Sequence, residues 1–224
     1  MAAGDPGRRP LPPDLGRLLH DLRGPLNSLT MHVEVLRRTV RDDPIAADSL
    51  RTVLEQLGRL AEMLPAAFAV ASLERGDWGV VDLRAVAAAA RDDAGGPVTL
   101  ADGRWPTVRG DAELLTLALA HLFRNAVEAT AAAGGAQPPR AGASVEGDET
   151  RVTVRDWGPG LRTTNASLLI RLLHSTKPGH RGLGLVTVER IARLHGGTLA
   201  FESPGAGTLV TLALPTVAKL TGTP

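Results

Sequence analysis

Apolar residues in the first third of the chain recur at steps of three and four. They fall at Leu15, Leu18, Leu22, Leu26, Leu29, Val33, Leu36 and Val40, and then, after Asp42-Asp43-Pro44, at Leu50, Val53, Leu57, Leu60, Leu64, Ala67 and Ala71. This spacing predicts two helices, each with an apolar seam that packs against a partner. We expect a helical hairpin over residues 14–75, with Asp48 as the N-cap of the second helix. Because two helices alone bury little surface, a dimer that forms a four-helix bundle is the natural completion.

The pattern changes after Gly76-Asp77, where short apolar runs predict strands at 80–81, 98–100, 145, 151–157, 197–201 and 207–215. Helical patterns lie between them over 83–91, 112–132 and 183–194, and segments 134–144 and 158–182 are rich in Gly, Pro and Thr, which is typical of loops. Neighbouring strands without strict alternation favour an α+β domain over residues 79–216 and disfavour a parallel dinucleotide-binding fold. We expect a disordered arm at 1–13 and a tail at 217–224.

Composition narrows the function classes. The 224 residues contain no cysteine, which excludes disulfides, thiol catalysis and thiolate metal sites. The net charge of +1 provides no basic stripe for nucleic acid. No apolar run approaches the length of a membrane span, and the first residues do not resemble a secretory signal. We therefore expect a cytoplasmic protein.

The stretch "LLHDLRGPLNSL" places His20 and Asp21 inside the first predicted helix. His20 lies two residues from both Leu18 and Leu22, so it is expected to face away from the seam. A neighbouring carboxylate raises imidazole basicity and accepts its proton. Gly24 and Pro25 are costly inside a helix, and Pro25 is expected to bend it just after His20. An outward-facing histidine beside a carboxylate and a helix bend indicates that another group must reach His20.

Three further stretches combine residues with a possible chemical role. "HLFRNAVEAT" carries Asn125 on a long helix, with His121 and Glu128 near the same face. "DWGPGL" places Asp156 at a strand end, followed by two glycines that permit a sharp exit. "HSTKPGHRGLGL" places Gly179, Gly182 and Gly184 at the start of a helix, where free N–H groups can cradle phosphate, and Lys177 lies within reach.

Together, in this order, the four stretches resemble the boxes of sensor histidine kinases of two-component signalling, over roughly residues 14–216. "HDLRGPLNSL" resembles the phospho-acceptor box, "HLFRNAVEAT" the N box, "DWGPGL" the first glycine box and "STKPGHRGLGL" the end of the ATP lid with the second glycine box. The resemblance implies a hairpin that dimerises into a four-helix bundle, followed by an α/β-sandwich ATP-binding domain of the type shared with gyrase.

The resemblance also implies a role for each matching residue. His20 would attack the γ-phosphate of ATP, and Asp21 would orient it and take its proton. Asn125 would bind Mg²⁺, and Asp156 would accept a hydrogen bond from the adenine amino group. The other implied ATP-binding residues are Gly158, Gly160, Thr176, Lys177, Gly182, Leu183 and Gly184. The implied contacts to a receiver domain of a response regulator are Asn27, Ser28, Met31 and His32.

Some positions depart from the pattern of the family. Gly24 stands where phosphatase-competent members carry Asn or Thr, which predicts a poor phosphatase. His121 replaces a common Asn, Trp157 a small polar residue, and Leu172, Leu173 and His174 stand where phenylalanines anchor the lid. Only a Pro- and Gly-rich arm stands ahead of the hairpin in this sequence. We therefore expect either a separate sensory partner or a sensor in a longer form of the chain.

Two other functions remain open. One is a histidine phosphotransfer or scaffold protein with a degenerate ATP-binding domain. The other is a serine kinase related to anti-sigma factors, whose members lack the hairpin with its histidine.

Overall fold

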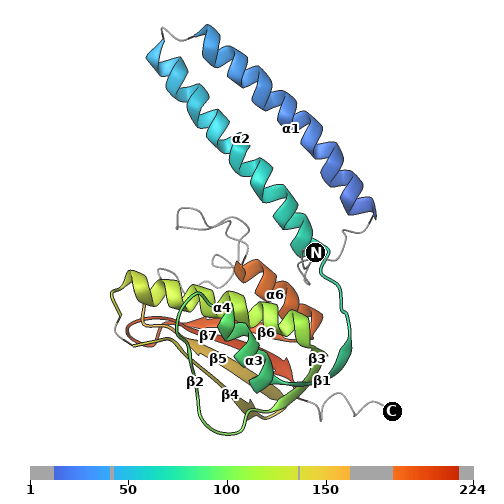
Figure 1. The fold of residues 1–224 in the computed structure, drawn as a ribbon, viewed down its shortest axis with the longest axis vertical. Helices are drawn as coiled ribbons and strands as arrows, with labels where there is room; N and C mark the ends of the chain where they lie inside the picture. The colour runs from blue at the N-terminus through green and yellow to red at the C-terminus, as the bar shows by residue number, and fades with distance from the viewer. Residues whose placement is uncertain (1–12, 41–42, 136, 162–183, 217–224) are drawn as a thin grey trace, which may run out of the picture. The chain divides into compact units, whose positions relative to one another are not determined.

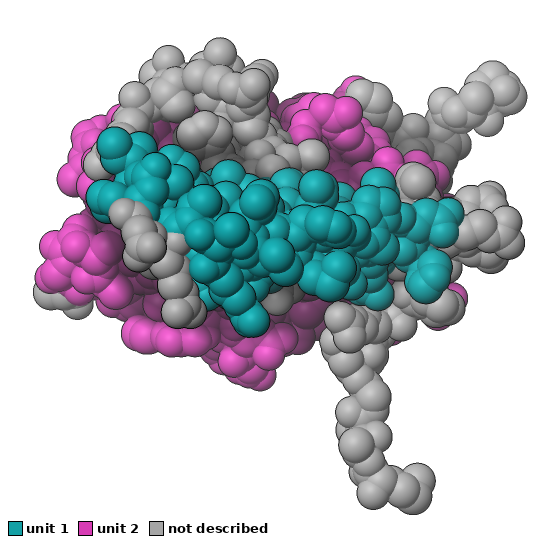
Figure 2. Space-filling model, turned by 90° about the horizontal axis from the view of Figure 1, so that it is seen from above, with its two compact units in different colours: residues 1–72, 179–181 teal, residues 73–178, 182–224 magenta. Residues whose placement is uncertain are grey.

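The computed structural model describes residues 13–40, 43–135, 137–161 and 184–216 (Figure 1). Within these residues the chain divides into two compact units, the first ending at Ser72 and the second beginning at Leu73 (Figure 2). Thr176, Lys177, Gly182 and Leu183, the predicted lid residues 172–174, and most of the predicted loop 158–182 lie outside the described residues. So do the predicted arm, except Pro13, and the predicted tail.

The first unit is a helical hairpin of α1 (Pro13–Thr39) and α2 (Pro44–Ala71), and α1 continues through Pro25. The prediction of Asp48 as the N-cap of the second helix is wrong. Asp43 caps α2, with its carboxylate accepting hydrogen bonds from the Ile45 and Ala46 amides at 3.0 and 3.1 Å. Pro44 has a φ angle suited to the first helical position and lacks the N–H that would be left unpaired there, so the helix begins before Asp48.

The apolar residues of the hairpin form two stripes rather than the one predicted seam. Leu26 and Leu57 of that seam are buried together with Leu19, which it did not include, and these three residues close the hairpin. The second stripe is exposed and repeats at seven-residue steps, with side chains 38–55% exposed. Its members are Leu22, Leu29 and Leu36 on α1 and Val53 and Leu60 on α2. A seven-residue apolar repeat is typical of helices that pack against further helices, so this stripe is suited to a second hairpin.

The second unit contains a five-stranded sheet in the order β2-β4-β5-β7-β6. Its strands are β2 (Thr99–Leu100), β4 (Arg140–Glu146), β5 (Glu149–Arg155), β6 (Thr198–Glu202) and β7 (Leu209–Pro215). Only the β2–β4 pair is parallel. A separate antiparallel pair joins β1 (Trp78–Asp82) to β3 (Thr107–Asp111).

Three helices pack on one side of the large sheet: α3 (Leu83–Asp92), α4 (Ala112–Ala132) and α6 (Gly184–Leu194) (Figure 1). Val152 and Val154 of β5 and Leu212 and Leu214 of β7 are at most 2% exposed, and they join the helices in one core. The α+β class is confirmed. No helix in the described ranges is long and apolar enough to cross a membrane.

The structure differs from the sequence prediction in two strands. β3 was not predicted, because Val108 is its only large apolar residue that is buried. β4 begins at Arg140, inside the segment 134–144 that was predicted to be a loop. Ala141 lies opposite Val154 and is fully buried, so a small residue fills a core position for which strand propensity gives no signal.

A buried histidine, His195, ties the ends of two helices together. Its Nδ1 lies 2.8 Å from the carbonyl oxygen of Ile191, so this nitrogen carries the proton, and its Nε2 accepts a 3.0 Å hydrogen bond from the Asp111 amide. Burial lowers the pKa of His195. Protonation would place a second N–H against the Asp111 donor, so the neutral ring is the one that fits.

His195 makes stability depend on pH. Because its pKa is lower in the folded than in the unfolded chain, the unfolded chain binds more protons below about pH 6.5. The free energy of unfolding should therefore be highest above that pH and fall on acidification, by at most about 1.4 kcal/mol per pH unit for one histidine. Denaturant titrations between pH 5 and 8 measure this, and His195→Gln should flatten the slope. Equal slopes in both proteins would contradict the assignment.

Candidate nucleotide site

The helix α4 positions Asn125 and His121. Leu115, Leu119, Leu122 and Phe123 anchor the helix in the core with at most 2% exposure, whereas His121 and Asn125 are only partly buried. Four residues apart, they lie on one face of the helix. An added Cβ at Gly184 would lie 3.5 Å from His121 Nδ1 and 3.8 Å from Asn125 Nδ2. The first residue of α6 therefore approaches both side chains closely.

Burial, with a smaller contribution from the charge of Arg124, lowers the pKa of His121 and so favours the neutral imidazole. A neutral imidazole has a nitrogen that accepts a hydrogen bond or binds a metal ion. The amide oxygen of Asn125 is a suitable ligand for Mg²⁺. The N–H groups at the start of α6 suit a phosphate group. These three groups fit the Mg²⁺–triphosphate part of a nucleotide.

The carboxylate of Asp156 is buried at the end of β5 and is 7% exposed. Its Oδ1 accepts two backbone hydrogen bonds, from Gly158 N and Thr208 N, both 2.9 Å long. Among the described residues, the bonds that this carboxylate accepts go to Oδ1. Its Oδ2 is therefore suited to a further donor, such as the amino group of an adenine. In Asp156, Oδ1 thus holds the local backbone, and Oδ2 is the oxygen suited to a ligand donor.

The glycines after Asp156 permit close approach of the backbone. A Cβ at Gly158 would lie 2.8 Å from Ala129 Cβ, so the loop packs directly on α4, one turn beyond Asn125. Gly160 has a φ of +77°, and its Cβ would lie 2.6 Å from Ser203 Oγ. The two glycines predicted from the first glycine box are therefore both required by the geometry.

Thr130, Gly207 and Thr208 also belong to this site, and the sequence analysis did not single them out. Thr130 Oγ1 accepts a 3.0 Å hydrogen bond from Trp157 N. Asp156 N donates a 2.9 Å hydrogen bond to Thr208 O, and Thr208 N donates in return to the Asp156 side chain. Thr130 ends the stretch "HLFRNAVEAT", and the sequence signal for Gly207 and Thr208 is the Gly-Ala-Gly run at 205–207.

Gly207 offers a direct test of this packing. It has a φ of +82°, and its Cβ would lie 2.1 Å from the Asp156 carbonyl oxygen, whereas Gly205 has a φ of +80° with open space around it. Gly205→Ala should cost only backbone strain, about 1–2 kcal/mol. Gly207→Ala should cost at least about 3 kcal/mol, because the backbone must also move. Chemical denaturation of both variants measures this, and equal losses would contradict the predicted contact.

The other predicted residues lie on α1, in the first unit. His20 and Asp21 are exposed, as expected for a histidine that faces away from the buried stripe. Asn27, Ser28, Met31 and His32 are exposed as well. The described candidate residues thus fall in two units, His20 and Asp21 in the first and the nucleotide-type residues in the second.

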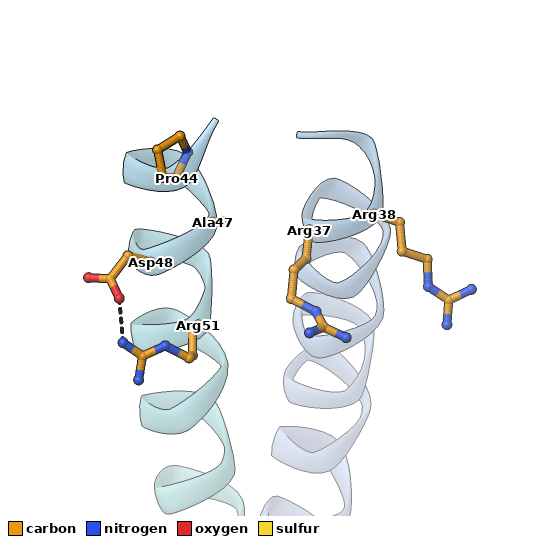
Figure 3. Close-up of a pocket in the computed structure, with 6 residues that line it drawn as sticks. All are labelled: Arg37, Arg38, Pro44, Ala47, Asp48 and Arg51. Carbon is orange, nitrogen blue, oxygen red and sulfur yellow. Dashed lines mark hydrogen bonds and ion pairs between the residues drawn. The ribbon is translucent and has the colours of Figure 1, made fainter. Parts of the chain in front are cut away.

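A separate pocket of about 460 Å³ lies at the turn end of the hairpin (Figure 3). It is lined by Arg37, Arg38, Pro44, Ala47, Asp48 and Arg51. Its arginines are paired with carboxylates: Arg37 contacts Glu34 at 2.6 Å, and Arg51 contacts Asp48 and Glu55. Exposed pairs of this kind contribute little to binding or stability, so this pocket is not the candidate site.

Known proteins share this architecture. Residues 110–218 match the family described as "Histidine kinase-, DNA gyrase B-, and HSP90-like ATPase". The chain is 26% identical over 217 residues to the signal transduction histidine-protein kinase AtoS of Escherichia coli, covering 90% of this chain and 35% of AtoS. It is 31% identical over 214 residues to the methanogenesis regulatory histidine kinase FilI of Methanothrix harundinacea, covering 88% of this chain and 24% of FilI.

Among solved structures, full-length ShkA in complex with AMPPNP superposes with a TM-score of 0.58 at 23% identity, covering 92% of this chain and 46% of ShkA. This likeness shows the fold. The family match over residues 110–218 identifies most of the second unit as an ATP-binding domain of the gyrase type. Over most of its length the chain is similar to sensor histidine kinases, and it spans only about a quarter to a third of the length of AtoS and FilI.

Proposed function

We propose that this protein is a histidine autokinase that phosphorylates His20 from Mg-ATP and passes the phosphoryl group to an aspartate of a response regulator. The observation that carries the proposal is an exposed histidine, followed by a carboxylate, on a helical hairpin in the same chain as a gyrase-type ATP-binding domain. Phosphate transfer from bound ATP to the histidine gives a reason for the presence of both the hairpin and the ATP-binding domain in one chain.

In this proposal the residues of the second unit bind and orient ATP. Asp156 Oδ2 accepts from the adenine amino group, while Gly158 and Gly160 bring the backbone close to the nucleotide. Asn125 holds Mg²⁺, and the start of α6 at Gly184 faces the phosphates. Thr176, Lys177, Gly182 and Leu183 complete the proposed binding set. The bound Mg²⁺ would neutralise charge that develops on the phosphates during transfer.

The transfer itself uses the residues of α1. An imidazole nitrogen of His20 forms a bond to the γ-phosphorus, the bond to the bridging oxygen breaks, and ADP leaves. Asp21 orients the ring and takes its proton. Gly24 has no side chain that could orient a water molecule for hydrolysis of the phosphorylated receiver, and it stands in open space. We therefore expect slow dephosphorylation of the receiver.

The exposed surfaces of the hairpin support two proposed partners. The exposed seven-residue stripe is proposed to pack on a second hairpin in a homodimer. Asn27 and Met31 lie seven and eleven residues after His20, which places them on its face of the helix. With Ser28 and His32 they form the proposed contact for a receiver domain.

Autophosphorylation is tested with γ-labelled ATP and Mg²⁺. Label should appear on the unchanged protein and be stable to base and labile to acid. His20→Ala and Asn125→Ala should abolish it, the first by removing the acceptor and the second by removing the metal ligand. His32→Ala, an exposed histidine on the same helix, is the matched control and should retain the label. Acid-stable label would instead favour a serine kinase.

Asp156→Asn separates nucleotide binding from folding. The asparagine oxygen can still accept from the Gly158 and Thr208 amides, so the unfolding midpoint should change little. Its amide nitrogen would replace Oδ2 and oppose the adenine amino group, which should weaken ADP binding about 10- to 100-fold. Calorimetry measures the affinity, with the exposed Asp102→Asn as control. Unchanged affinity would exclude the assigned adenine contact.

A phosphotransfer protein with a degenerate ATP-binding domain is the second candidate, and His121 in place of the common asparagine is the observation that favours it. In that case His20 would receive phosphate from a receiver rather than from ATP. Absence of both label and ADP binding in the unchanged protein would select this candidate.

A further inference from the structure

The segment between the hairpin and the first strand, residues 73–77, is bound to the second unit along its length. Gly76 N donates a 2.7 Å hydrogen bond to Asp111 Oδ2. Arg75 Nε donates a 2.6 Å bond to the carbonyl oxygen of Leu194. Arg190 Nη2 donates a 3.2 Å bond to the carbonyl oxygen of Leu73. The linker segment, as we call residues 73–77, is thereby attached to the start of α4 and the end of α6.

A stack of three side chains reinforces this attachment. The guanidinium of Arg75 lies 4.9 Å from the centre of the Trp78 ring. Trp78 in turn stacks on His195, with ring centres 4.9 Å apart. His195 is the ring that accepts from the Asp111 amide, and Asp111 also caps α4 through Glu113 N and Leu114 N. The linker segment therefore shares its anchor with the two helices that frame the nucleotide site.

The attachment is nevertheless easy to release. Glu74, Arg75 and Asp77 are exposed, and Leu73 packs at the edge of the core. Arg190 Nε is buried and has no hydrogen-bond partner within the described part of the chain. A buried donor without a partner costs free energy, so the bound arrangement is not fully satisfied. Detachment would expose few apolar atoms and leave the core intact.

We propose that the linker segment is a latch that limits the reach of the ATP-binding unit toward His20. While it is bound, the linker segment belongs to the second unit, and the boundary between the two units lies at Ser72. When it is released, its residues add about 17 Å of extended chain at about 3.4 Å each. The proposal rests on the proposed function, because reach matters only if phosphate moves from bound ATP to His20.

Arg75→Ala tests the latch in the full chain. It removes the bond to Leu194 and the contact with Trp78 without touching the nucleotide residues. We expect faster hydrogen exchange at the Gly76 amide, ADP affinity within twofold of the unchanged protein, and an initial autophosphorylation rate at least threefold higher. Arg91→Ala, which removes an exposed arginine on α3, is the control and should change none of these.

A second variant lengthens the chain while keeping the latch contacts. Gly-Ser-Gly inserted between Ser72 and Leu73 should raise the autophosphorylation rate and leave the Gly76 amide protected. An unchanged or lower rate in either variant would overturn the latch, and so would a loss of ADP affinity in Arg75→Ala. If the unchanged protein binds ADP but takes no label, the proposed function fails and the latch fails with it. If the unchanged protein and all variants are labelled at equal rates, the latch is overturned and the proposed function stands.

Discussion

The packing of α4 between α3, α6 and the sheet is the constraint on which the candidate site depends. Nine of its 21 residues are buried, and its apolar side chains face more than one partner element. His121 and Asn125 are among the residues that remain partly accessible. Because the helix cannot rotate without opening the core, their position relative to Gly184 and Gly158 is fixed by core packing. The site is therefore as rigid as the core beneath it.

Two buried aspartates, Asp111 and Asp156, use the same arrangement for different purposes. In each, Oδ1 accepts two backbone N–H bonds and so fixes the local chain: Asp111 caps α4, and Asp156 joins its own loop to Thr208. The second oxygen of each then faces a different group. In Asp111 it holds the linker segment at Gly76. In Asp156 the same kind of oxygen fits a ligand donor. This difference is the reason to expect that a conservative substitution of Asp156 affects ligand binding more than folding.

The sequence predicted the elements whose signal is local and missed those whose signal is distant. The periodicity over 112–132 gave the bounds of α4 as the structure has them, and the glycines after Asp156 were correctly expected to permit a sharp exit. The hydrogen bond from Thr208 N to the Asp156 side chain joins residues 52 positions apart, so no local sequence pattern predicts it. The first part of β4 was predicted to be a loop, because Ala141 and Gly142 owe their place in the strand to the strands beside them. The seam of the hairpin could not be divided into its two stripes, since buried and exposed leucines have the same spacing in the sequence.

The departures from the family pattern do not weaken the nucleotide site equally. Trp157 donates its indole N–H to the carbonyl oxygen of Pro138 at 3.1 Å, and Arg155 lies 5.2 Å over its ring. Those contacts lie outside the hydrogen bonds of the Asp156 carboxylate, so this large residue is accommodated without occupying the ligand oxygen. His121 is different, because it stands next to Asn125 and Gly184. Burial lowers the pKa of its ring and so favours the neutral form, which can bind a metal or accept a hydrogen bond as an asparagine does. Neither position therefore removes a group that the proposed ATP site uses.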